Sequence, residues 1–512
     1  MSATEDAVTA GAPEASAAAA DDTHISRGLL MVATVVILGA IMSILDTTVV
    51  NVAINTLAAR FHTTLPTIQW VATGYTLALA TVIPLSGWIA DRFGTKRLYM
   101  GSIAMFALGS CLSGLAWSTA TIILFRVLQG LGGGMIMPAG MTILTRAAGP
   151  QRIGRVMAIM GVPMLLGPIL GPILGGWLVA DVSWRWIFFI NLPIGIAALI
   201  LARRVLPKDV AEHSQRLDIV DLLLVSPGLA LVIYGLAESS SSGGFGSSKV
   251  LIPLLIGIVL LVAFVRHALR TKDPLIDLRL FKNRTFATSS ISLALMVISV
   301  FGAFLLLPLY FQAVRGESPL MAGVLLVPQG LGSMITMPIA GQLSDKTGAG
   351  KIVPFGLIAI LASVAWLTQI GANTSWLAIC IDLFVFGLGM GFAMMPIFTG
   401  AMQSVSGAAA ARASTSLNII QQTGASIGTA VLSVLLATEL ASQLGRGSHG
   451  TIGATAVSPA ARAHIAGPMA TAFGHTFVWA CVLLGVALLG SLTLPKRRPE
   501  FGESGAPPTI PI

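Results

Sequence analysis

Long apolar segments follow one another along almost the entire chain. About fourteen of them approach 20 residues, the length that a helix needs to cross a hydrocarbon core of about 30 Å. Backbone groups find no water partners in lipid, and runs this uniformly apolar exclude the alternating strands of a barrel. The pattern predicts an all-α polytopic membrane protein with fourteen transmembrane helices. The predicted spans are 28–50, 67–90, 98–117, 121–144, 156–179, 185–203, 217–237, 250–268, 286–312, 320–343, 352–371, 376–401, 413–438 and 470–494.

Basic residues fall mainly on one side of these predicted spans. If the N-terminus is cytoplasmic, 23 of the 30 Lys and Arg residues lie in the inner segments and six in the outer ones. Arg126 alone is placed inside a span, because the other basic residues fall at span ends or between spans. Because basic residues stay on the cytoplasmic side, this bias predicts a cytoplasmic (inner) membrane protein with both termini inside. The net charge of +9 is therefore a topology signal, and it does not indicate nucleic-acid binding.

Composition agrees with a membrane protein and offers no cofactor site. Charged residues make up 10% of the chain, against about 25% in soluble globular proteins. The three cysteines lie inside apolar runs, without metal-ligand or disulfide spacing. Residues 1–27 are Ala-rich and acidic, which does not resemble a signal peptide. We interpret them, and residues 495–512, as cytoplasmic tails, and we expect no metal and no cofactor.

An internal repeat divides the predicted helices. Residues 87–94 and 341–348 both read Gly-x-x-x-Asp-basic-x-Gly and follow the second and tenth spans. Transporters are often built from such repeats, with the substrate site between them near the membrane midplane. The repeat predicts two pseudo-symmetric six-helix halves, 28–206 and 285–494, with two extra central helices inserted at 217–270.

Asp46 stands out in the first span. About 15 apolar or small residues precede it without a charge. An intramembrane acid is costly and is by default a candidate functional residue, and burial disfavours its charged form. Asp46 is therefore a candidate for reversible protonation. The alternative is a carboxylate near the outer helix end that reaches water.

Arg126 is a positively charged residue in the fourth span. An intramembrane Arg needs a carboxylate, carbonyl groups or water beside it, although a long side chain can also reach an interface. Gly130 and Gly132–134 follow it. Because no strand precedes these glycines, they indicate close helix packing and not a dinucleotide loop.

The fifth span carries glycines and prolines at regular spacing. Three of its glycines recur every four residues and line one helix face, and its prolines interrupt the hydrogen-bond ladder and permit a bend. The motif residues are Gly161, Gly167, Pro168, Gly171, Pro172 and Gly175. This chemistry predicts a packed, kinked helix that lets one half rock on the other.

Four patterns together resemble the major facilitator superfamily, and within it the fourteen-spanner drug:proton antiporters of EmrB/QacA type. They are the Asp46 segment, residues 87–97, the Arg126 segment and the glycine-rich fifth span, and the resemblance covers about residues 28 to 494. One departure is Asn55, where the family usually has proline. The resemblance implies that Asp46 and Arg126 are coupled through a proton step. It also implies that the protein exports its substrate, because the fifth-span motif marks exporters in this family.

The resemblance also points to a conformational latch on the cytoplasmic side. Glycine permits close helix approach, and Asp91 can face a helix N-terminus or a basic partner across the two halves. Such a latch would hold the cytoplasmic side shut; the alternative is a solvated charge cluster that only sets topology. The latch residues are Gly87, Asp91, Arg92, Gly94 and Asp345.

Residues for a substrate site are less distinctive. Asp382 is an unusual acid in the twelfth span, suited to a cationic substrate, a second proton or a structural polar pair. Aromatic and amide side chains suit apolar cations through stacking and cation–π contacts, although ordinary helix packing explains each one singly. The candidates are Asp382, Tyr75, Gln329, Asn418 and Gln422.

Together these patterns predict a non-enzymatic, proton-coupled secondary exporter of lipophilic or cationic compounds. Its partners would be those substrates, protons and membrane lipids, with no nucleic acid, and the sequence does not indicate an accessory protein. No Gly-x-x-x-x-Gly-Lys-Ser/Thr loop for ATP occurs. Two alternatives stay open: a dedicated exporter of an envelope lipid, peptide or siderophore, and a membrane sensor or scaffold that does not transport.

Overall fold

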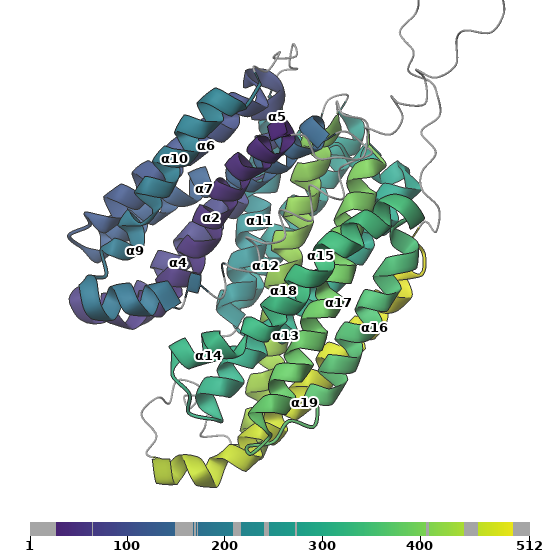
Figure 1. Ribbon diagram of the computed structural model, residues 1–512. Coiled ribbons are helices and arrows are strands. Elements are labelled where there is room, and N and C mark those ends of the chain that lie inside the picture. Colours follow the sequence, from purple (N-terminus) through teal and green to yellow (C-terminus); the bar gives the residue numbers. More distant parts are fainter. Residues whose placement is uncertain are drawn as a thin grey trace, which may run out of the picture.

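The computed structural model consists of long helices arranged in two bundles (Figure 1). It describes residues 27–63, 65–148, 167, 170–171, 173–207, 217–239, 245–271, 274–405, 409–444 and 459–494. Every regular element within these ranges is helical. The fold is therefore the all-helical membrane architecture that the sequence predicts.

The N-terminal bundle is built from the purple to blue helices of Figure 1. Its elements are α2 (Arg27–Arg60), α3 (Leu65–Ile68), α4 (Trp70–Val82), α5 (Leu85–Phe93), α6 (Thr95–Gly114), α7 (Thr119–Ala148), η2 (Leu178–Val182), α9 (Trp186–Phe189) and α10 (Asn191–Val205). The long spans follow from uninterrupted apolar sequence, whereas Pro84 separates α4 from α5.

The central and C-terminal elements continue in teal, green and yellow. They are α11 (Ile219–Ser239), α12 (Ser248–Arg270), η3 (Leu278–Lys282), α13 (Arg284–Ala313), α14 (Pro319–Leu325), α15 (Val327–Thr347), α16 (Ala349–Leu367), α17 (Trp376–Gln403), α18 (Ala410–Leu444) and α19 (Pro459–Ser491).

Eleven of the described helices are long and apolar enough to cross a membrane, or twelve if α4 and α5, bent by 55°, form one span. Two of the fourteen predicted spans are not among these helices. The third corresponds to α6, whose first turn carries Lys96 and Arg97, and the fifth lies largely outside the described residues. The count of fourteen stays a prediction.

The two bundles repeat the same helix pairings. In the first, α2 packs on α10, and α7 packs on α4 and α6; in the second, α13 packs on α19, and α17 packs on α15 and α16. The connection after the second span is also repeated, because Gly94 (φ 91°) and Gly348 (φ 85°) both join two helices in a left-handed conformation that glycine favours. The bundles are therefore pseudo-symmetric halves.

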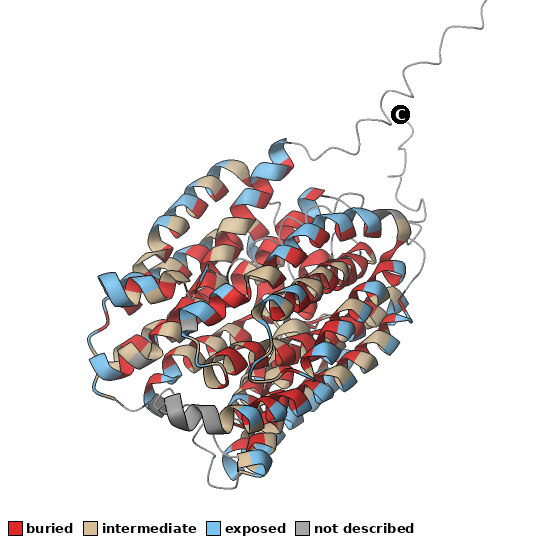
Figure 2. Cartoon of the chain, turned by 60° about the horizontal axis from the view of Figure 1, so that its bottom comes forward, coloured by how far each residue is buried: buried red, intermediate tan, exposed pale blue. Residues whose placement is uncertain are grey.

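Helices α11 and α12 pair with each other beside the junction of the halves. Helix α11 contacts both α4 and α18, whereas α12 carries many exposed apolar side chains. Figure 2 shows buried residues where helices meet and exposed ones on the outer faces. An exposed apolar helix face suits contact with lipid chains. The sequence boundaries of the insertion fall partly outside the described residues, so the domain limits stay predictions.

Candidate functional site

The structure brings Asp46 and Arg126 together inside the N-terminal half. Asp46 lies on α2 and Arg126 on α7, and an Nη1–Oδ2 distance of 2.5 Å joins them. Each residue is 1% exposed, so neither reaches bulk water. A charge in such surroundings is tolerated only when it is paired and hydrogen-bonded, and here each group supplies the other's counter-charge.

Amide side chains complete the surroundings of this pair. Gln129 accepts a hydrogen bond from Arg126 Nη1 (2.8 Å) and donates one from Nε2 to Asp46 Oδ1 (2.8 Å). Asn191, the first residue of α10, donates to the same oxygen at 3.1 Å and to Ser110 Oγ at 3.0 Å. Asp46 therefore accepts from three side chains on two neighbouring helices, which places its carboxylate in a fixed geometry.

Helix α4 supplies the remaining contacts of the guanidinium. Arg126 Nε donates to the Val71 carbonyl oxygen at 3.1 Å, and the Arg126 Cζ atom lies 4.2 Å from the centre of the Tyr75 ring. Such a cation–π contact stabilises a desolvated guanidinium. Tyr75 Oη lies 3.4 Å from Ser43 Oγ, one turn before Asp46. Tyr75 thus contacts the charge cluster, which consists of Asp46, Arg126, Gln129 and Asn191. Its role in substrate binding stays a prediction.

The glycines of the fifth span lie directly against α2 beside Asp46. A Cβ atom at Gly167 would overlap Ile44, and one at Gly171 would overlap the Thr48 side chain. At Gly175 it would lie 3.1 Å from the Val49 carbonyl oxygen. These glycines are required for the close approach, whereas Gly161, Pro168 and Pro172 lie outside the described residues.

The two halves meet at the end of the bundle where α5 crosses the start of α18. Asp91 Oδ2 lies 3.5 Å from Arg412 Nε across the halves, and Asp91 Oδ1 lies 4.0 Å from Arg146 Nη2. Ser86 Oγ and Thr415 Oγ1 are 3.0 Å apart and share a hydrogen bond. We call the Asp91–Arg412 and Ser86–Thr415 contacts the latch. That these contacts act as a conformational latch stays a prediction.

The other predicted latch residues have different places. A Cβ atom at Gly87 would lie 3.3 Å from Thr415 Oγ1, so the glycine permits the helix contact. Gly94 ends α5 in the left-handed conformation described above. Arg92 is exposed beside the latch. Asp345 is in α15, and its side chain lies outside the described ones. Their roles stay predictions.

The remaining substrate candidates do not share a site with Asp46. Asp382 on α17 accepts a hydrogen bond from Ser363 of α16 at 2.9 Å, within the C-terminal half. Gln329 on α15 is 3% exposed and its Nε2 faces Met390 Sδ at 3.9 Å. Asn418 and Gln422 lie one turn apart on α18, and Asn418 Nδ2 donates to the Ser414 carbonyl oxygen. The substrate role of these residues stays a prediction.

A small cavity lies between helices of the two halves and the central insertion. Its volume is about 200 Å³, and α4, α11 and α18 line it. The lining residues are Thr73, Thr76, Leu77, Ile233, Ala237, Ser426 and Thr429. Pockets for drug-sized ligands occupy about 300–1,000 Å³, so this cavity alone does not hold a whole drug molecule.

Sequence reasoning missed three residues of these sites. Gln129 is three positions after Arg126 and so lies on the same helix face, which was the available signal. Asn191 is polar within an apolar run, and it was treated as part of an aromatic interfacial segment. Arg412 was used only as a topology marker, because nothing local reveals that it faces Asp91.

A buried ion pair between helices of one half, and polar contacts between two pseudo-symmetric halves, fit the architecture of a membrane transporter. Residues 36–429 match the model of the Major Facilitator Superfamily. The chain is 48% identical over 416 residues to the "Multidrug resistance protein B homolog" of Mycobacterium tuberculosis, covering 81% of this chain and 77% of the relative. It is 30% identical over 406 residues to "Multidrug export protein EmrB" of Escherichia coli K12, covering 78% of each.

A solved transporter structure shares the fold. The structure of the human organic anion transporter MFSD10 (TETRAN) superimposes with a TM-score of 0.59 at 15% identity, covering 89% of this chain and 99% of that one. The chain belongs to the major facilitator superfamily, in its multidrug-efflux branch of EmrB type.

Proposed function

We propose that this protein exports lipophilic and cationic compounds across the cytoplasmic membrane in exchange for protons. The observation that carries the proposal is the buried Asp46–Arg126 pair, held by donors from α7 and α10. A purely structural helix junction does not need a charge pair at 1% exposure, and replacing such a pair by apolar side chains is often neutral or stabilising. Its presence supports a role in proton coupling.

Protonation of Asp46 would change the forces inside the N-terminal half. The carboxylate would lose its negative charge, and its new O–H would face Arg126, Gln129 and Asn191, which already direct donors at it. One donor must then turn away. Because Arg126 cannot lose its own proton, the cluster has to rearrange.

The glycine contacts give this rearrangement a route to helix movement. Asp46 lies between Ile44 and Thr48, the residues of α2 that meet Gly167 and Gly171. Thr48 Oγ1 also lies 3.2 Å from the Gly167 carbonyl oxygen. A shift of α2 would therefore also move the fifth span. Close contacts of this kind would let one half rock against the other, so that the central site opens to one side of the membrane at a time.

The C-terminal half repeats the packing without the acid. Gly424 and Gly428 of α18 lie against α13 as the fifth span lies against α2. Helix α13 contains no Asp or Glu. This asymmetry supports a single coupling site in the N-terminal half, with the C-terminal half as its partner in rocking.

Proton and substrate would then compete through conformation. Substrate binding from the cytoplasm favours release of the Asp46 proton, and proton binding from outside favours substrate release, which is a negative coupling free energy between two ligands. One charge that crosses 100 mV is worth about 2.3 kcal/mol, which is enough to bias the cycle.

Inverted membrane vesicles test this proposal. Ethidium should dissipate an imposed pH gradient in wild-type vesicles, and Asp46→Asn should abolish the response. Asp181→Asn is the control, since it removes an exposed acid of η2 that lies outside the candidate sites. Equal responses of wild type and Asp46→Asn would exclude Asp46 as the coupling carboxylate.

A further inference from the structure

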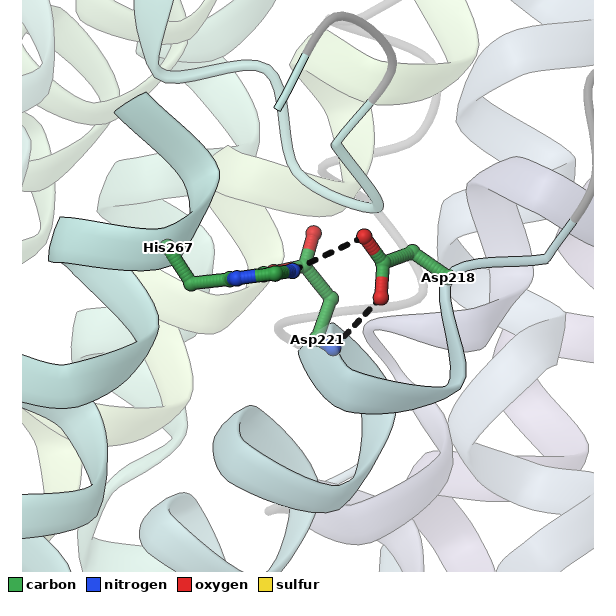
Figure 3. Close-up of side chains that lie close together, drawn as sticks. All are labelled: Asp218, Asp221 and His267. Carbon is green, nitrogen blue, oxygen red and sulfur yellow. Dashed lines mark hydrogen bonds and ion pairs between the residues drawn. The ribbon is translucent and has the colours of Figure 1, made fainter. Parts of the chain in front are cut away.

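Three side chains with metal-ligating atoms converge where the start of α11 meets the end of α12 (Figure 3). Asp218 directly precedes α11, Asp221 lies in its first turn, and His267 lies in the last turn of α12. One nitrogen and two carboxylate oxygens of these residues all lie within 4.8 Å of one another. His267 is 49 positions from Asp218, so no short sequence motif reveals the cluster.

The distances suit one divalent transition-metal ion. His267 Nε2 lies 3.0 Å from Asp218 Oδ2 and 3.9 Å from Asp221 Oδ1. Tetrahedral zinc with metal–ligand distances near 2.0–2.1 Å separates its ligand atoms by about 3.4 Å. The two measured separations bracket this value, so small movements of the side chains would accommodate the ion.

One carboxylate oxygen of this cluster is not hydrogen-bonded. Asp221 is fully buried, yet its Oδ1 atom accepts no hydrogen bond from the described residues. Its other oxygen, Oδ2, accepts from the Leu275 backbone N–H at 2.8 Å. A buried oxygen that accepts no hydrogen bond destabilises the folded protein, and a bound cation would remove that cost.

Backbone groups orient the second carboxylate in the same manner. Asp218 Oδ1 accepts from the N–H groups of Val220 (2.9 Å) and Asp221 (3.1 Å), which leaves Oδ2 directed at His267. Each carboxylate thus has one oxygen held by the backbone and one turned to the same point, as metal ligands do.

We infer that Asp218, Asp221 and His267 form a binding site for a divalent transition-metal ion such as Zn²⁺. One imidazole and two carboxylates form a mixed nitrogen–oxygen donor set, which favours zinc-like ions over Mg²⁺ or Ca²⁺. Three protein ligands leave a fourth position for water. The Thr271 hydroxyl, 3.3 Å from His267 Nε2, lies at the edge of the site.

The site is adjacent to the latch, so metal binding would favour one conformation. A metal ion would join α11 to α12, and the Leu275 N–H already joins Asp221 to the segment after α12. Asp277 in that segment lies 4.0 Å from Arg412 Nη1, and Arg412 contacts Asp91. A bound ion would thus hold the insertion in the arrangement that accompanies the closed latch.

Calorimetry on the purified full-length protein tests this inference without any transport assay. The protein carries no histidine tag, is stripped with chelator, and is titrated with ZnCl₂ in detergent. Wild type should bind one equivalent, and His267→Gln and Asp218→Asn should each weaken binding at least tenfold. Size-exclusion chromatography shows that the variants are folded.

A second histidine–carboxylate pair provides the matched control. His475 Nδ1 lies 3.2 Å from Glu439 Oε2, but this pair is more exposed and has a single carboxylate. His475→Gln should leave zinc binding unchanged. Absence of a saturable equivalent in wild type, equal binding by His267→Gln, or equal affinity for Mg²⁺ would each overturn the assignment. A purely structural hydrogen-bonded cluster would give the first of these results.

Discussion

The buried Asp46–Arg126 pair leads to a prediction about the free energy of unfolding. Arg126 and Asp46 side chains are 1% and 0% exposed, so removing either partner leaves the other as an uncompensated charge inside the bundle. Breaking a buried pair in this way costs roughly 3–5 kcal/mol. Arg126→Gln and Asp46→Asn should each lower the free energy of unfolding by about this amount.

Combining the two changes should restore much of the lost stability. The double variant buries two neutral amide groups and no charge, so its loss should be well below the sum of the single losses. The difference measures the coupling between the residues. The free energy of unfolding is obtained from denaturation in mixed micelles, followed by tryptophan fluorescence.

The two single variants should also differ in their response to pH. In Arg126→Gln, acid protonates Asp46 and removes the buried charge, so the unfolding free energy should recover as the pH falls. In Asp46→Asn, Arg126 stays charged at every accessible pH, so no such recovery should occur. Additive losses in the double variant, or the same pH response in both single variants, would refute this account of the cluster.

Other contacts give further predictions. Gly171→Ala should reduce transport and thermal stability because its methyl group overlaps Thr48, whereas Gly176→Ala, which meets nothing within 4 Å, should change neither in the same assays; equal effects would contradict the close helix contact. Ser86→Cys with Thr415→Cys, in a background without the three native cysteines, should form a disulfide that blocks ethidium export until a reductant is added. Undiminished export by the oxidised protein would show that the latch does not open during the cycle.

The sequence predicted those features that contrast with their local surroundings. Asp46 and Arg126 are conspicuous because charges are rare in apolar segments, and Gly167, Gly171 and Gly175 are conspicuous by their spacing. The alternation of basic residues favoured a particular series of spans along the chain. The apolar helices of the described residues occur in the same series.

Partners on other helices could not be predicted from the sequence. Gln129 and Asn191 are neutral, and such residues also occur where helices merely pack, so only the fold shows that both donate to Asp46. The same holds for Arg412, which meets Asp91 across the halves. The contact of the fifth span with α2 also depends on tertiary packing that no local pattern encodes.

The measurement that tests proton coupling most directly is proton release when substrate binds to the purified protein. Ethidium is added to detergent-solubilised protein in weakly buffered solution, and a pH indicator follows the released protons. The account predicts release by wild type and by Asp181→Asn, and none by Asp46→Asn, although that variant still binds ethidium. Equal release by wild type and Asp46→Asn would contradict it.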